Sequence, residues 1–325
     1  MQWVAVMLTT GLCLTACNKA NGGASTKDLA WVTADASVTL PGSAITPVDL
    51  SKDSAERGVQ VGSLPSAMAF TKHANLLVVT EGDDRLHEVD PSTDKVLHSV
   101  TVGVEPDAIA VAPGGTNDAG IALVSNLDSN SVTPVDLGTW KAMTPIAVGN
   151  EPVSVAVVAS GPGMGTAFVA DFGSNEVTPI DLKGLQPGPP IAVGPGPQTV
   201  AAAGLEVLVG NFGNSTLTPI NAVTLQPSAA IALPVNPTDI AVDTSGTTAY
   251  ITGGAALVSL TVSTLALGPP VQLPDVSEGM ALAANGTAWV ALQGGSLIEV
   301  TLATGAVGHR IHVGGHPSSV AIAPS

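Results

Sequence analysis

Carboxylate and amide side chains recur in this sequence in the turn-like segments between short apolar stretches. Oxygen ligands of this kind hold hard cations such as Ca²⁺, and a group of carboxylates also attracts organic cations. Tight turns favour Asp and Asn for conformational reasons too, so turn formation alone would explain the same pattern. We expect a ligand or cation face formed by Glu105, Asp107, Glu151, Asp171, Glu278 and His316. Asn236 and Asp239 fall on the same face, and the other set of loops adds Glu81, Asp83, Asp84, Asn126, Asp128 and Asn211.

Histidine could add a transition-metal or acid–base function to this face. The densest group is His309, His312 and His316. His309 and His312 are three residues apart in an extended segment, which places their side chains on opposite faces. Only His316 falls in a turn beside the acidic residues. The sequence therefore identifies no metal, and a divalent cation is one hypothesis beside that of exposed histidines without a ligand.

Standard catalytic motifs are absent from the sequence, which contains no G-x-S-x-G, no H-E-x-x-H, no P-loop and no dinucleotide-binding fingerprint. The segment Asp128-Ser129-Asn130-Ser131 begins like a calcium loop but lacks the Gly and the terminal Glu of that motif. A β-turn explains it better. We assign no catalytic residue, and the sequence favours a protein that is not an enzyme.

The charge of the chain excludes one class of partner. Its 325 residues include 26 Asp and Glu but only 10 Lys and Arg, which gives a formal net charge of −16. Such a field repels phosphate backbones, so we expect no nucleic-acid partner. Aromatic residues make up 3% of the chain, whereas Gly numbers 36 and Pro 25. This composition fits a turn-rich β protein with a core of small and branched aliphatic residues.

The first 28 residues have the pattern of an export and anchoring signal. The apolar stretch Val4–Leu14 is too short to span a membrane but suits a signal peptide. It ends in Leu-Thr-Ala-Cys17, which resembles the lipobox of bacterial lipoproteins, although Met1-Gln2-Trp3 supplies no Lys or Arg. An ordinary signal peptide that contains a Cys is the alternative. We expect residues 1–17 to be a lipoprotein signal peptide, Cys17 to be lipidated, and residues 18–28 to be a flexible tether.

Residues 29–325 contain one unit repeated seven times. The phrase Val-Gly-x-x-Pro, with degenerate copies, ends at positions 65, 106, 152, 197, 237, 277 and 317, at spacings of 40 to 46 residues. Four residues after each of these positions comes an alanine, seven times in seven: Ala69, Ala110, Ala156, Ala201, Ala241, Ala281 and Ala321. A repeat of this period and regularity indicates stacked or ring-forming units rather than two separate domains.

Each unit divides into four short strands without a helical period, which is typical of a propeller blade. The chain ends on a single first strand, and it begins with segments that correspond to strands two, three and four. We therefore predict an all-β, seven-bladed β-propeller whose ring is closed by three N-terminal strands and one C-terminal strand. One feature disagrees with this pattern: Pro47, Pro134, Pro179 and Pro219 fall inside the third strand, where proline is disfavoured.

The segment from Phe168 to Asp181, FVADFGSNEVTPID, followed by Val193-Gly194-Pro195-Gly196-Pro197, resembles the YVTN (YncE-like) β-propeller repeat. The resemblance covers essentially all of residues 29–325. It implies a seven-bladed propeller of a kind found mostly in exported and cell-surface proteins, and it implies no single reaction. The chain departs from the family pattern by having Pro where the family usually has Val in the third strand.

Two classes of function follow from these observations. The first is a lipid-anchored, extracytoplasmic propeller in the cell envelope, expected to be a monomer, that binds a protein, glycan or small ligand through its acidic loop face without catalysis. The second is a propeller enzyme of the lactonase or metal-dependent lyase type. Its site would lie at the channel mouth and would use His316 with Glu105, Glu151 and Glu278.

Overall fold

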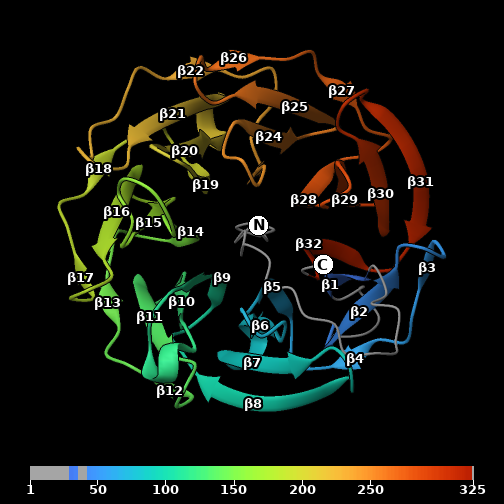
Figure 1. Cartoon of the computed structure of the whole chain (residues 1–325), viewed down its shortest axis with the longest axis horizontal. Helices are drawn as coiled ribbons and strands as arrows, with labels where there is room; N and C mark the ends of the chain where they lie inside the picture. The colour runs from blue at the N-terminus through green and yellow to red at the C-terminus, as the bar shows by residue number, and fades with distance from the viewer. Residues whose placement is uncertain (1–28, 36–41, 324–325) are drawn as a thin grey trace.

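Seven small antiparallel sheets form a closed ring (Figure 1). The computed structural model describes residues 29–35 and 42–323. Within these ranges the only helices are three short 3₁₀ turns, η1 (Glu81–Asp83), η2 (Thr116–Asp118) and η3 (Phe212–Asn214), and no helix is long and apolar enough to cross a membrane. The prediction of an all-β, seven-bladed propeller is confirmed. Residues 1–28, which include Cys17, the signal peptide and the tether, lie outside the described ranges.

The first three sheets, which we number as blades 1 to 3, follow one another along the chain. Blade 1 consists of β5 (Pro65–Phe70), β6 (Leu76–Thr80), β7 (Arg85–Asp90) and β8 (Lys95–Thr101). Blade 2 consists of β9 (Pro106–Ala112), β10 (Ile121–Asn126), β11 (Ser131–Asp136), β12 (Lys141–Ala142) and β13 (Ile146–Ala147). Blade 3 consists of β14 (Pro152–Val157), β15 (Thr166–Asp171), β16 (Glu176–Asp181), β17 (Gln186–Pro187) and β18 (Ile191–Ala192).

Three more blades and a composite one complete the ring. Blade 4 consists of β19 (Pro197–Ala203), β20 (Glu206–Asn211), β21 (Thr216–Asn221) and β22 (Ile231–Ala232). Blade 5 consists of β23 (Asp239–Val242), β24 (Thr248–Gly253), β25 (Ala256–Thr261), β26 (Ala266–Leu267) and β27 (Val271–Gln272). Blade 6 consists of β28 (Ser277–Leu282), β29 (Thr287–Leu292), β30 (Ser296–Thr301) and β31 (Ala306–His312).

The closing blade joins the two ends of the chain, as the sequence predicted. It consists of β1 (Leu29–Asp35), β2 (Ala44–Asp49), β3 (Ser54–Ala55), β4 (Val59–Gln60) and the C-terminal β32 (His316–Ile322). Strand β1 pairs with β2 on one side and with β32 on the other. The ring is thus completed by backbone hydrogen bonds between residues nearly 300 positions apart, because Ala30 pairs with Ile322.

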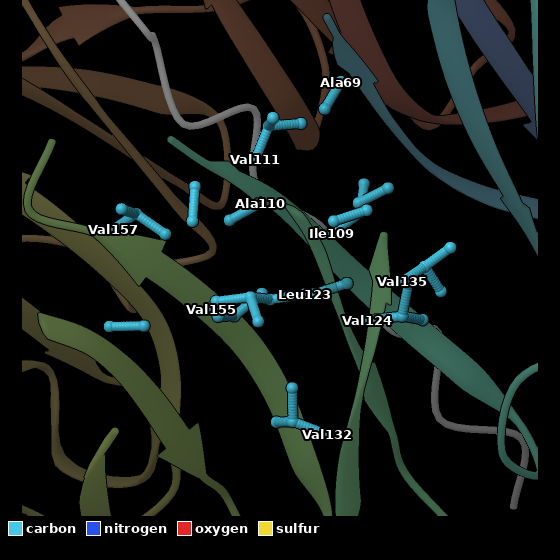
Figure 2. Packing of buried hydrophobic residues seen from close by; sticks show 14 of the residues in the cluster. Ala69, Ile109, Ala110, Val111, Leu123, Val124, Val132, Val135, Val155 and Val157 are labelled. Atoms are coloured by element: carbon cyan, nitrogen blue, oxygen red, sulfur yellow. The ribbon is translucent and has the colours of Figure 1, made fainter. Parts of the chain in front are cut away.

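The innermost strands are β5, β9, β14, β19, β23, β28 and β32, and each contacts the next around the axis. The repeated alanine lies on these strands and is buried in all seven. In most blades it faces a large side chain on the second strand: Ala321 pairs with Trp31, Ala156 with Phe168 and Ala281 with Trp289. A small residue is needed here because neighbouring blades converge. Figure 2 shows this packing, with Ala110 beside Val155 and Val157 of the next blade.

The prolines of the third strand lie where the outer strand is interrupted. Pro134 pairs with Leu123 of the second strand, and its carbonyl oxygen accepts a hydrogen bond from Met143 N–H at 2.8 Å. Its backbone polar groups therefore face the outer strand, which is split there into β12 and β13. Pro47 and Pro179 lie at the same kind of break. Proline removes no hydrogen bond from the inner ladder, which resolves the apparent conflict with the sequence.

The four-residue linker between blades bonds alternately to the two blades that it joins. Between blades 1 and 2, Val102 N–H donates to Asp84 O at 3.0 Å, and Gly103 N–H donates to Asn126 Oδ1 at 3.0 Å. Glu105 N–H donates a hydrogen bond to Asp84 Oδ1 at 3.0 Å, while Glu105 O accepts one from Leu127 N–H at 2.8 Å. Glycine is required at position 103, because a Cβ there would lie 2.5 Å from Asn126.

The residue before the repeat proline, which we call the junction residue, has the same arrangement at the next two junctions. Glu151 N–H donates to Asn130 Oδ1 at 2.9 Å, and Gly196 N–H donates to Asn175 Oδ1 at 2.8 Å. Asn130 and Asn175 lie in the left-handed region, with φ of 50° and 59°. Each lies directly before a third strand, β11 or β16, and its side chain accepts a hydrogen bond from the linker that follows its own blade.

Substitutions at Asn130 separate its two contributions. Asn130→Gly removes only the side-chain hydrogen bond, so we expect a loss of about 1 kcal/mol in the free energy of unfolding. Asn130→Ala also strains a left-handed backbone position, so it should cost about 1 kcal/mol more. Chemical denaturation of both variants checks this. Equal stability of the two variants would contradict the role of the backbone conformation.

Candidate functional site

The residues of the predicted face lie at one end of the ring, where the innermost strands begin and the second strands end. Glu105 and Glu151 are junction residues, Asp107 and Glu278 are the second residues of β9 and β28, and His316 opens β32. The loops from fourth to first strand and from second to third strand are hydrogen-bonded to each other at this end, as between Phe172 N–H and Glu151 O at 2.9 Å. Asp171 is the last residue of β15.

Asp171 is a component of the linkage between blades. Its carboxylate accepts a hydrogen bond from the Thr178 hydroxyl at 2.6 Å, and Gly149 N–H also donates to it. Asn126 has the equivalent position in blade 2, where it accepts from Gly103 N–H and donates to the Thr133 hydroxyl. The fold thus uses Asp171 much as it uses asparagine elsewhere. Burial raises its pKa to about 7, and the hydrogen bonds oppose this rise.

Two further buried acids lie at the start of innermost strands in blades 5 and 6. Asp239 Oδ2 accepts a hydrogen bond from Met280 N–H at 2.8 Å, which links β23 to β28. Burial raises the pKa of Asp239 to about 7 against the effect of this hydrogen bond and one from Ile240 N–H. Burial alone raises the pKa of Glu278 to about 7.

The junction between blades 1 and 2 contains several carboxyl groups in addition to the one that accepts a hydrogen bond from the linker. We call Glu81, Asp84, Glu105, Asp107 and Asp128 the acidic junction. Asp107 is 1% exposed, and neither of its carboxyl oxygens has a hydrogen-bond partner. Burial, followed by the negative charges of Glu81 and Glu105, raises the pKa of Asp107 well above its ordinary value. Every charged group that acts on it there is itself acidic.

Glu105 connects the buried part of the acidic junction to its surface. Burial is the main cause that raises the pKa of Glu105, followed by the charge of Asp128, a hydrogen bond with the Asp128 side chain, and the charge of Asp84. Asp128 is exposed, Glu105 is partly exposed and Asp107 is buried. The carboxyl groups therefore form a row that runs from solvent into the junction.

The backbone at Glu105 is strained. Its φ is 53°, and Glu151 has the same value, whereas the corresponding junction residue in the next repeat is Gly196 with φ of 59°. A residue with a Cβ costs about 1 kcal/mol or more in this conformation. Two consecutive junctions thus carry glutamate where the backbone favours glycine.

His316, Glu105, Glu151 and Glu278 are distributed over four of the seven blades. Going around the ring from β32, which holds His316, the next innermost strand in one direction is β28, which holds Glu278. In the other direction the innermost strands follow in the order β5, β9 and β14. Glu105 precedes β9 and Glu151 precedes β14, so β5 separates both from His316. Within residues 29–35 and 42–323, no three His, Asp or Glu side chains converge as a metal site would require.

The buried acids predict how stability depends on pH. A carboxyl group whose pKa is about 7 in the folded protein keeps its proton between pH 4 and 7, whereas the unfolded chain has released it. Their contribution is fully present below about pH 4 and is lost as the pH rises to about 7. We expect the melting temperature to fall over this interval.

Asparagine variants test whether the buried carboxyl groups cause this fall in the melting temperature. Asp171→Asn and Asp239→Asn should each flatten the decline and raise stability at pH 7.5 by on the order of 2 kcal/mol. Thermal unfolding followed between pH 4.5 and 8 is the measurement. Asp181→Asn, at the exposed last residue of β16, is the control and should keep the wild-type profile. A wild-type melting temperature that rises toward pH 8 would contradict the assignment.

Comparisons with known proteins support the fold and leave the family open. No family model matches the chain, and no curated protein matches it either. Among solved structures, a functionally unknown protein from Desulfotomaculum acetoxidans is similar over 91% of this chain and 99% of its own, with 14% identity and a TM-score of 0.75. A candidate 6-phosphogluconolactonase from Bacteroides uniformis is similar over the same shares, with 14% identity and a TM-score of 0.71.

A third similar structure belongs to the hydrazine synthase of Kuenenia stuttgartiensis. It matches 78% of this chain and 88% of its own, with 17% identity and a TM-score of 0.68. At these identities the likeness defines the class of fold alone. The chain is a seven-bladed β-propeller, and its function has to be argued from its own residues.

Proposed function

We propose that this protein is an exported, lipid-anchored β-propeller that acts as a non-catalytic binding scaffold, with its ligand at the acidic junction. The observation that carries the proposal is Asp107, a buried carboxyl group with two unpartnered oxygens among other carboxyl groups. Buried polar groups without partners are costly, so such a group in a well-packed fold points to a partner that is bound there.

The fold itself requires neither of the two central carboxyl groups. The position of Asp107, directly after the repeat proline, is Ser66 in blade 1 and Val153 in blade 3, and both are buried in the same ring. The position of Glu105 is glycine at Gly196. Blades of the same architecture form without these charges, which supports a role in binding.

The proposed location rests on the N-terminal sequence. Leu-Thr-Ala-Cys17 has the pattern of a lipobox, and residues 18–28 have the composition of a tether. The resemblance of residues 29–325 to the YVTN repeat supports the same location, because the family occurs mostly in exported and cell-surface proteins. An acyl-anchored propeller would display the end of its ring to ligands outside the cytoplasm.

The lipid anchor has a direct test. Cys17→Ser removes the acceptor of the acyl chains, so the protein should move from the membrane fraction to the soluble extracytoplasmic fraction. Fractionation with immunodetection measures this, and a Cys13→Ser variant is the matched control that should stay with the membrane. Membrane association that persists in the Cys17→Ser variant would overturn the anchor.

A second candidate function is that of a lactonase, and the likeness to the Bacteroides uniformis protein favours it. The substrate that this protein's name indicates carries a phosphate group. The acidic junction would repel such an anion, because the charges that act on Glu105 and Asp107 are all negative. The enzyme reading therefore needs a site elsewhere on the ring.

Ligand-induced thermal stabilisation distinguishes the two functions. We expect at least one cation among Ca²⁺, Mg²⁺, Mn²⁺ and organic ammonium compounds to raise the melting temperature, and 6-phosphogluconate to leave it unchanged. The intrinsic fluorescence of Trp31 and Trp289, both buried, reports unfolding of the full-length protein in detergent. Glu105→Gly should abolish the response without loss of stability, since Gly196 occupies the same backbone conformation. Stabilisation by the phosphosugar alone would favour the lactonase.

A further inference from the structure

The row of carboxyl groups at the acidic junction has a buried end and an exposed end. Asp107 forms the buried end, within the field of Glu81 and Glu105. Glu105 is also close enough to Asp128 to share a hydrogen bond with it, and Asp84 acts on Glu105 from the preceding blade. Glu105 therefore lies between Asp107 and Asp128 and is close to both carboxyl groups.

Asp107 restricts what can occupy the buried end. Its two oxygens can only accept hydrogen bonds once the group is ionised, and no protein donor reaches either of them. A ligand at this position must therefore bring donors and positive charge. A primary ammonium group has three N–H donors and one charge on a narrow stem, which suits a buried carboxylate without protein donors.

The arrangement of the row argues against a metal ion. Ca²⁺ requires six to eight oxygen ligands that converge on one point at 2.3–2.6 Å. Within the part of the chain that the structure describes, no three acidic or histidine side chains converge in this way. Carboxyl groups that follow one another from Asp128 through Glu105 to Asp107 match charges that follow one another along a ligand.

We infer that the acidic junction binds a linear organic diammonium cation, with one ammonium group at Asp107 and the second at Glu105 and Asp128. The inference rests on the proposed function and names the class of its ligand. The exposed side chain of Val104, next to Glu105, is 52% accessible and offers an apolar contact for the methylene chain between the two charges.

Binding of 1,4-diaminobutane to the full-length protein in detergent tests the inference by isothermal titration calorimetry. We expect saturable binding, with 1-aminobutane and CaCl₂ at least tenfold weaker because each can engage only part of the row. Asp107→Asn should weaken diamine binding at least tenfold through loss of the charge-assisted hydrogen bonds. The matched control is Asp239→Asn, which removes the same charge from a buried carboxyl group that accepts a hydrogen bond from Met280 in blade 6.

The pH dependence of binding gives a second and independent arm. Because the pKa of Asp107 is raised, an ammonium group must displace its proton. Diamine affinity should therefore increase between pH 5.5 and 8, and binding heats in two buffers of different ionisation enthalpy should show proton release. The groups that face Asp107 are Glu81 and Glu105, and they are acidic as well. In Asp107→Asn the proton release should decrease and the pH dependence should weaken.

The outcomes are decisive in each arm. Equal weakening by Asp107→Asn and Asp239→Asn would show non-specific attraction to an acidic protein and would overturn the inference. Equal affinity for the monoamine and the diamine would also overturn it. If diamines fail to bind while Ca²⁺ or another cation still stabilises the wild type but not Glu105→Gly, the diammonium inference is wrong and the proposed binding function stands.

Discussion

The linker between blades controls the position of every group at the candidate site. Its amides bond first to one blade and then to the next, and the junction residue is fixed on both sides: Glu105 donates to Asp84 and accepts from Leu127. A closed ring without disulfides in residues 29–325 depends on such local bonds, because each blade alone is a small sheet with little core. The hydrogen bond from Leu127 N–H to Glu105 O also holds the loop that carries Asp128 against the linker that precedes Asp107.

Much of the fold was predictable because the positions that recur in every repeat are those where close packing allows only a small side chain. The alanine of the innermost strand recurs because blades converge there, and the glycine of the linker recurs because Asn126 or Asp171 lies against it. Proline in the third strand could not be understood from the sequence. Proline fits there because its backbone groups face the outer strand at the point where that strand is interrupted. Both features depend on how the strands pair and are not visible in the composition.

The candidate site was predictable in its members but not in its grouping. Glu105 and Asp107 were expected on one face together with Glu151, Glu278 and His316, yet the ring distributes these residues over four blades. Asp171 was expected among possible ligands and is used in the linkage.

Asn130 and Asn175 were overlooked as linker contacts, although each stands 18 residues before the Val of a Val-Gly phrase, as Asp84 does. Burial and missing donors, which distinguish Asp107, have no signal in the sequence.

The central position of β1 in the closing blade has a mechanical consequence. The strand lies between β2 and β32, with ladders on both sides. A force applied to the chain ahead of Leu29 acts along β1 and loads both ladders in shear, so many backbone hydrogen bonds must break together. An edge strand pulled at its end would instead peel away one bond at a time. A pull on the N-terminal end of β1 is therefore resisted by two ladders together rather than by one.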